Sequence, residues 1–118
     1  MSGLSTHILD LMHGQPAANV KVELFYYTAL NDRTLLETFY TNDDGRLNQP
    51  FQPQSGLQTG TYEYIFYIGD YFRGKEVELP NPAFLDEVAV RFGVADASSH
   101  YHVPLLVSPF GYQVYRGS

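Results

Sequence analysis

The sequence contains no cysteine. A thiol nucleophile, a cysteine-ligated zinc site and a disulfide framework are therefore excluded, and His, Asp and Glu remain as the side chains that could bind a metal. Positive charge is also scarce, because 7 Lys and Arg stand against 13 Asp and Glu, for a formal net charge of -6. Phosphate binding needs a concentrated positive face, so we expect no nucleic-acid partner. An anionic ligand would need cations gathered locally.

Long apolar runs are missing as well. No stretch approaches the roughly 18 residues that span a bilayer. The first seven residues, MSGLSTH, lack the basic and apolar regions of a secretory signal. We therefore expect a cytoplasmic protein with no membrane partner, and the length of 118 residues predicts a single domain over 1–118.

Several familiar catalytic motifs are absent too. The chain has no G-x-S-x-G elbow, no glycine-rich phosphate loop and no H-E-x-x-H zinc helix. Aromatic residues are abundant instead, with 10 Tyr and 8 Phe. These side chains suit half-buried pleated surfaces, which favours strands over helices.

The hydrophobic pattern predicts an all-β protein. The stretch Val20–Tyr26 alternates apolar and polar residues before it becomes wholly aromatic, the period-two pattern of a strand with one buried face. Further candidate strands cover 4–10, 34–41, 60–68, 88–95, 101–108 and 111–115, with turn-forming residues between them. Short strands at this spacing indicate a two-sheet antiparallel β-sandwich. One short helix is expected over 69–76, with Asp70 as its cap.

Histidines give the first chemical signal. His7 lies in the first candidate strand, and His100 and His102 fall on one face of a later one. The alternative is ordinary surface histidines, with His100 merely ending the preceding loop. A three-histidine metal site is a further alternative. Pro104 has no N–H for the sheet ladder, so it predicts an open or irregular edge beside this strand.

Two further positions could hold an anionic or carbonyl-rich ligand. Arg46 follows the turn residues 42–45, and its guanidinium is a planar fork of donors that stays charged. An arginine after a turn is more commonly a solvated charge. The terminal residues 115–118 run directly out of an aromatic strand, so this tail is either frayed or held in a site.

Four motifs carry a resemblance to a known family: LSTHILD with GQPAA, then TNDDGR, then HYHVPLL, and the terminal YRGS. On these motifs the chain resembles the transthyretin-like 5-hydroxyisourate hydrolases over nearly its whole length. The terminal motif is the most specific, because it separates the hydrolases from the hormone-carrying transthyretins.

The resemblance implies a transthyretin-like sandwich that assembles into a homotetramer, a dimer of dimers, with active sites in the clefts where dimers meet. It implies no cofactor and no metal, and a small purine-derived partner, 5-hydroxyisourate. The catalytic residues that it implies are His7, Arg46, His102 and Ser118. Those implied to contact the substrate are His7, Arg46, Tyr115 and Arg116.

On this basis we expect one of His7 and His102 to take a proton from a water molecule that attacks a ring carbonyl, with Arg46 stabilising the developing charge. The residues do not tell which histidine is the base. Three alternatives remain: a non-enzymatic transthyretin-like binding protein, a metal-dependent hydrolase, and a carbohydrate-binding or adhesion sandwich.

Overall fold

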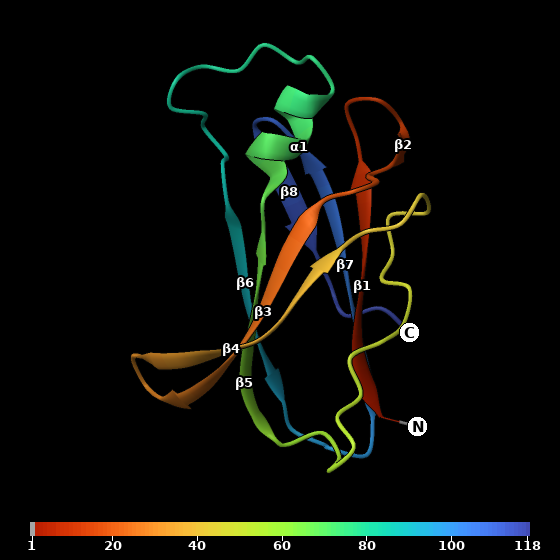
Figure 1. The fold of residues 1–118 in the computed structure, drawn as a ribbon, viewed down its shortest axis with the longest axis vertical. Helices are drawn as coiled ribbons and strands as arrows, with labels where there is room; N and C mark the ends of the chain where they lie inside the picture. The colour runs from red at the N-terminus through yellow and green to blue at the C-terminus, as the bar shows by residue number, and fades with distance from the viewer. Residues whose placement is uncertain (1) are drawn as a thin grey trace.

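A computed structural model describes residues 2–118, and it confirms the predicted β-sandwich with one short helix. Two four-stranded sheets pack face to face, in the strand orders β2-β1-β7-β8 and β4-β3-β5-β6 (Figure 1). The elements are β1 (Gly3–Asp10), β2 (Gln15–Pro16), β3 (Lys21–Ala29), β4 (Asp32–Tyr40), β5 (Gly60–Phe66), α1 (Ile68–Gly74), β6 (Val88–Val94), β7 (His100–Ser108) and β8 (Gly111–Val114).

One pairing departs from the antiparallel prediction. Strands β1 and β7 run parallel, from Gly3 opposite His100 to Asp10 opposite Val107. Every other strand pair in the two sheets is antiparallel. A parallel pair needs a long crossover, and here the whole second sheet lies in the connection between β1 and β7. Because the pairing is non-local, the alternation within each strand could not reveal it.

The core lies between the two sheets. On β1 and β7, alternate residues point inward, so Leu4, Ile8, Leu105 and Val107 are fully buried. Aromatic rings of β5 and α1 fill the centre, including Tyr64, Phe66 and Phe72. The intervening residues of β1 and β7 therefore face outward, away from the core.

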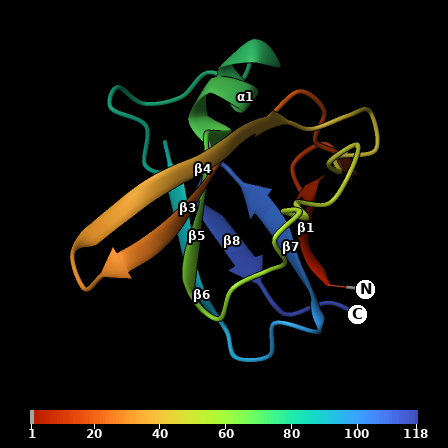
Figure 2. The same cartoon turned by 60° about the horizontal axis from the view of Figure 1, so that its bottom comes forward.

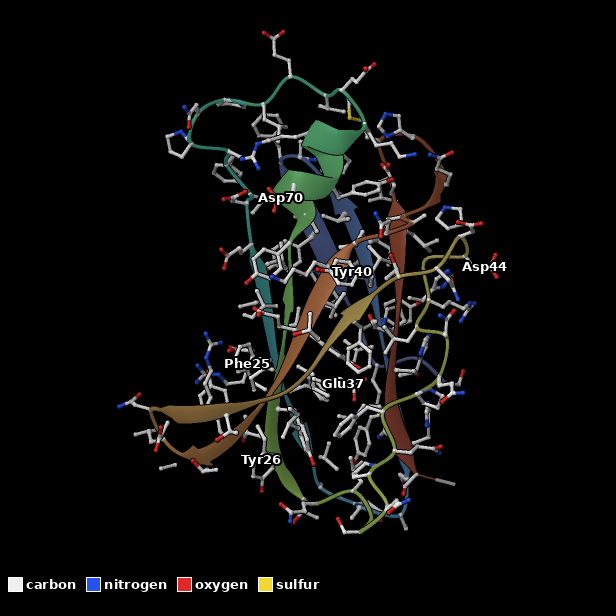
Figure 3. The ribbon with its side chains drawn as sticks, viewed as in Figure 1. Phe25, Tyr26, Glu37, Tyr40, Asp44 and Asp70 are labelled. Atoms are coloured by element: carbon white, nitrogen blue, oxygen red, sulfur yellow. The ribbon has the colours of Figure 1, made fainter. Side chains whose placement is uncertain are left out.

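The helix begins earlier than predicted. It covers Ile68–Gly74 with Tyr67 at its N-cap, and no side chain bonds the cap. Asp70 is inside the first turn and accepts a hydrogen bond from Arg73 Nη1 at 3.0 Å, so the cap prediction was wrong (Figure 3). Burial of Ile68 and Phe72 against the sheets sets where the helix starts. Burial has therefore outweighed the local capping preference.

The helix is tied to β1 through a buried carboxylate. Asp10 accepts hydrogen bonds from the Tyr71 hydroxyl at 2.7 Å and from His13 Nδ1 at 2.6 Å through Oδ2. Its Oδ1 accepts the backbone N–H groups of Met12 at 2.9 Å and of His13 at 3.0 Å. Both carboxylate oxygens are thus satisfied, as a buried charge requires.

The β3–β4 hairpin is longer than its alternation indicated. Strand β3 continues to Ala29 and β4 starts at Asp32, so the hairpin projects away from β5 beyond Tyr26, the last β3 residue paired with that strand (Figures 1 and 2). Strand β5 is shorter than predicted, because the chain leaves it at Phe66 to enter the helix. The short strand β2 lies where only a turn was expected.

Candidate active site

The outer face of the β1–β7 pair carries the histidines. Ser5 and His7 alternate with the buried residues of β1, and His102 is the direct neighbour of Ser5 across the parallel pair. His7 lies opposite Pro104, one step further along the same face. The pairing therefore brings together two histidines that are far apart in the sequence.

His100 belongs to this face as well. It is the first residue of β7, so the suggestion that it merely ends a loop was wrong. Its Nε2 lies 2.9 Å from Ser5 Oγ, and His102 Nδ1 lies 2.7 Å from the same oxygen. Both rings thus meet one hydroxyl, which confirms that the two histidines share a face. The sequence singled out no role for Ser5, whose only signal was its place two residues before His7.

A tight turn delivers Arg46 to this face. Asn42 Oδ1 accepts the backbone N–H groups of Asp44 at 2.9 Å and of Arg46 at 3.1 Å. Gly45 has φ +74°, and a Cβ there would collide with the Ile8 carbonyl oxygen. Only glycine therefore lets the turn, marked by Asp44 in Figure 3, approach β1 so closely.

The same turn is bonded directly to the first strand. Ile8 N–H donates to the Gly45 carbonyl at 2.8 Å, and His7 and Arg46 form an isolated antiparallel bridge. Arg46 is consequently placed next to His7 by backbone hydrogen bonds rather than by side-chain contacts.

The terminal residues are held along β7. Regular β8 pairing stops at Leu105 opposite Val114, and it resumes as a bridge between His102 and Gly117, in the same register. The gap falls at Pro104, which has no N–H to donate, as the sequence predicted. Gly117 N–H donates to the His102 carbonyl at 2.7 Å. The tail therefore does not fray, and this bond places Ser118 beside His102.

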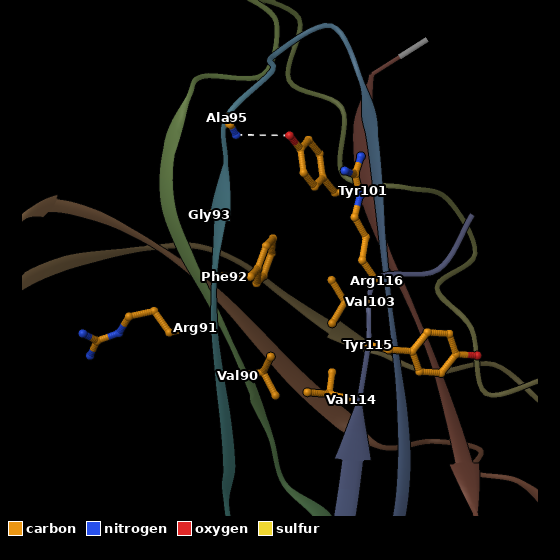
Figure 4. A pocket seen from close by; sticks show the side chains of 10 residues that line it. All are labelled: Val90, Arg91, Phe92, Gly93, Ala95, Tyr101, Val103, Val114, Tyr115 and Arg116. Carbon is orange, nitrogen blue, oxygen red and sulfur yellow. Dashed lines mark hydrogen bonds between the residues drawn. The ribbon is translucent and has the colours of Figure 1, made fainter.

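Tyr115 and Arg116 point to opposite sides of this segment. The Arg116 guanidinium lies 4.0 Å from the centre of the Tyr101 ring, and its Nη2 donates to the His100 carbonyl at 3.3 Å. Figure 4 shows Arg116 extending beside Tyr101 while the Tyr115 ring turns away from Phe92. An apolar pocket of about 350 Å³ lies on this inner side, between the edges of β6 and β8. Its lining contains none of the histidines, so it is not where we place the chemistry.

A cavity on the outer side collects the predicted site residues. It has a volume of about 450 Å³ and is lined by His7, Leu9, Arg46, His102, Pro104, Tyr115, Arg116, Gly117 and Ser118. A neighbouring cavity of about 300 Å³ shares Arg46, His102 and Ser118 with it and adds Ser5 and His100. The structure therefore brings every candidate site residue to one outer cavity, with Arg116 contributing from the edge.

The electrostatics of this cavity favour neutral imidazoles. Burial lowers the pKa of His7, and the Arg46 charge lowers it further, whereas a backbone hydrogen bond and the charge at Asp44 act in the opposite direction. The pKa of His102 is lowered by burial, then by the charge of Arg46, and further by electrostatic interaction with His7 and His100. A neutral imidazole can accept a proton, so either ring can act as a base near neutral pH. Arg46 supplies the local positive charge that the acidic chain otherwise lacks.

Residues 2–118 contain no group of three or more His, Asp or Glu side chains arranged to hold a metal ion. His7, His100 and His102 are therefore not arranged as one metal site in this part of the chain. In the same residues, no helix combines the length and the apolar character needed to cross a bilayer.

Solved structures place this sandwich among known folds. It superposes on (S)-allantoin synthase with a TM-score of 0.91 and 39% identity, covering 99% of this chain but 44% of that longer one. The 5-hydroxyisourate hydrolase of Klebsiella pneumoniae gives a TM-score of 0.81 and 32% identity over 100% of both chains. Sea bream transthyretin in complex with thyroxine gives 0.85 and 26% over 98% of this chain and 94% of that one. The fold is thus a transthyretin-like sandwich.

Residues 4–117 match the HIUase/Transthyretin family, and the chain belongs to this family. The 5-hydroxyisourate hydrolase 2 of Rhizobium meliloti is 53% identical over 115 residues, covering 98% of this chain and 95% of that protein. The 5-hydroxyisourate hydrolase of Pseudomonas aeruginosa is 48% identical over 118 residues, covering 100% and 93%. These relatives confirm the prediction of an enzyme that is a hydrolase.

Proposed function

We propose that this chain hydrolyses 5-hydroxyisourate to 2-oxo-4-hydroxy-4-carboxy-5-ureidoimidazoline, a step of urate degradation. The observation that carries the proposal is the convergence of His7, Arg46 and His102 with residues 115–118 on one cavity of about 450 Å³. Two 5-hydroxyisourate hydrolases are 53% and 48% identical to the chain over almost its full length. A cavity of this size accommodates a purine-sized molecule.

Substrate binding would depend on the positive charge of Arg46 in the cavity. The substrate is flat, rich in carbonyl groups and inclined to carry negative charge. Arg46 offers a planar set of donors that matches such a molecule, with Tyr115 lining the same cavity. The Arg116 guanidinium is stacked on Tyr101, so its contribution is a longer-range positive charge at the edge of the cavity.

The chemistry would be general-base hydrolysis of a ring amide. One of His7 and His102 takes a proton from water, and the resulting hydroxide oxygen bonds to the carbonyl carbon. Arg46 and the Ser118 hydroxyl stabilise the negative charge that develops on the carbonyl oxygen. The carbon–nitrogen bond then breaks, and the proton held by the imidazole passes to the departing ring nitrogen. The six-membered ring opens, and the water atoms end on the new acid and the ureido group.

We further propose that the active form is a homotetramer. Strands β6 and β8 are edge strands of their sheets, as are β2 and β4, so each offers an edge for pairing with a second copy. Large apolar side chains near β8 are exposed, including Phe110, Tyr112 and Tyr115. The cavity opens on the outer sheet face, where a second dimer would close it. Light scattering on the purified protein should give the mass of four chains, and a monomeric active enzyme would contradict the assembly.

The decisive assay follows the ultraviolet absorbance of freshly oxidised urate with and without the protein. Wild-type protein should accelerate the decay, and His7→Asn and His102→Asn should lower turnover by about a hundred- to ten-thousandfold. His13→Gln is the matched control, because His13 bonds Asp10 and lies outside the cavity lining. Wild-type rates in both cavity variants would contradict the proposed base.

A second candidate is a non-enzymatic small-molecule binder, which the likeness to sea bream transthyretin in complex with thyroxine favours. The cavity argues against it, since two histidines and an arginine suit a small anion better than a hydrophobic ligand. The same assay separates the two. Unchanged decay together with saturable binding of thyroxine would support the binder.

A further inference from the structure

Ser5 stands between two imidazoles. Its Oγ is 2.7 Å from His102 Nδ1 and 2.9 Å from His100 Nε2. A hydroxyl has one proton, so it can donate to only one of these nitrogens. The other nitrogen must then donate its own proton to Oγ. The protonation states of the two rings are therefore linked through one oxygen atom.

The direction of these bonds decides what His102 can do. When Ser5 donates to His100, His102 carries its proton on Nδ1, and its Nε2 keeps a lone pair that can accept a proton. When the bonds run the other way, His102 is protonated at Nε2 and cannot act as a base there. Space beside the His102 ring is also limited on the side of the tail, because a Cβ added at Gly117 would lie 2.7 Å from His102 Cδ2.

The charges around the pair favour removal of a proton from His102. Electrostatic interactions with Arg46, His7 and His100 all lower the pKa of His102. His102 lines both cavities with Arg46, and the larger of them, which His100 does not line, also contains His7. A proton on His102 is therefore close to both Arg46 and His7, whereas a proton on His100 shares only the smaller cavity with Arg46.

We propose that Ser5 and His100 form a proton relay behind His102, which rests on the proposed function with His102 as the base. When His102 Nε2 takes a proton from water, the Nδ1 proton passes to Ser5 Oγ while the Ser5 hydroxyl proton passes to His100 Nε2. The positive charge thereby moves to His100, and no atom is gained or lost. The reverse passage returns the proton for the departing ring nitrogen. Ser5 and His100 are positioning residues, because they act through His102.

Kinetics of single variants test the relay. Ser5→Ala and His100→Gln should each lower kcat by about ten- to a hundredfold with little change in KM, because positioning of the base is lost while substrate contacts remain. Ser5→Thr keeps the hydroxyl and should retain more turnover than Ser5→Ala. The amide of His100→Gln can still bond Ser5 but cannot take up a proton, so it separates the relay from a purely structural bond.

A double-variant cycle separates this proposal from the proposed function. In a His102→Asn background, Ser5→Ala should cause no further loss, because the relay then has no base to serve. Impaired His102→Asn with wild-type kcat in Ser5→Ala and His100→Gln would overturn the relay alone. Wild-type turnover in His102→Asn would overturn the relay and His102 as the base together.

The ring protons of His102 give a readout that does not depend on activity. Nitrogen-15 NMR of wild-type protein should show His102 protonated on Nδ1, and Ser5→Ala should shift the population toward the Nε2 form while the melting temperature stays close to that of wild type. An unchanged tautomer in Ser5→Ala, or a wild-type ring protonated on Nε2, would overturn the proposal.

Discussion

Gly117→Ala should damage the active site while sparing the fold. A Cβ at this position would lie 2.7 Å from His102 Cδ2 and 3.1 Å from Pro104 Cγ, whereas ordinary van der Waals contact begins at 3.4 Å. The His102 ring cannot simply turn aside, because Ser5 Oγ holds its Nδ1 at 2.7 Å. Either the ring moves by several tenths of an ångström, or the tail leaves β7 and takes Ser118 with it.

Both outcomes should lower turnover strongly and reduce the free energy of unfolding only slightly. Displacing a catalytic group by a large fraction of an ångström lowers turnover by about ten- to a hundredfold. Losing the bond between Gly117 N–H and the His102 carbonyl costs about 1 kcal/mol of unfolding free energy. In a chain of this size that is a drop of about 3–6 °C in melting temperature.

The assay is the initial rate of 5-hydroxyisourate decay, measured together with a thermal melt. Gly111→Ala is the matched control in the same segment, because its Cβ would meet nothing nearer than Ser108 Oγ at 4.0 Å. The control should keep both rate and melting temperature. A Gly117→Ala protein with wild-type kcat and KM would refute the placement of His102 and the tail in one site.

The remaining predictions address pH, stability, the chain end and metals. Activity needs neutral imidazole, and the pKa values of His7 and His102 are lowered, so the plateau of a kcat/KM profile should extend below pH 6.5. Asp10→Ala should reduce the free energy of unfolding in urea by about 3–5 kcal/mol, because it strips a buried carboxylate from the Tyr71 hydroxyl and backbone donors. A short extension after Ser118 should lower turnover by at least about tenfold by crowding the cavity. Chelation followed by elemental analysis should leave the rate unchanged, and its loss would favour the metal-dependent alternative.

The lowered pKa of Asp10 also predicts how the stability of the protein changes in acid. Burial raises its pKa, but the hydrogen bonds from Tyr71 and His13 outweigh burial and leave the pKa below 3.8. A carboxyl whose folded pKa is lowered stabilises the protein above its unfolded pKa, and that stability is lost as the pH falls through the folded value. Urea midpoints measured between neutral pH and pH 3 should fall less steeply in Asp10→Ala than in wild type.

The strands were predictable because their signal is local. The alternation within Val20–Tyr26 predicted β3. The same alternation of side chains along a strand predicted that His100 and His102 share one face. Helix capping failed at Asp70 because burial of Ile68 and Phe72, which depends on the packed core, moved the helix start. Local patterns thus located the elements better than their ends.

The sequence pattern alone could not show which residues come together in the site. Nothing in the spacing of His7 and Arg46 indicates that they form a bridge, since that contact depends on a turn closing against β1. Their grouping came from the resemblance to a family. Ser5 gave no signal beyond its place two residues before His7, because a serine in a strand gains a role only when β7 lies beside it.

The parallel pairing of β1 with β7 also bears on how the protein reaches its working state. Ser5 and His102 are 97 positions apart, so the loop closed by their contact includes most of the polypeptide. Such distant docking carries a large entropic cost that hairpins such as β3–β4 avoid, and topologies of this kind acquire their native contacts late. Any intermediate with β1 undocked has Ser5 and His7 apart from His102 on β7. Catalytic activity is therefore expected only from the fully folded protein.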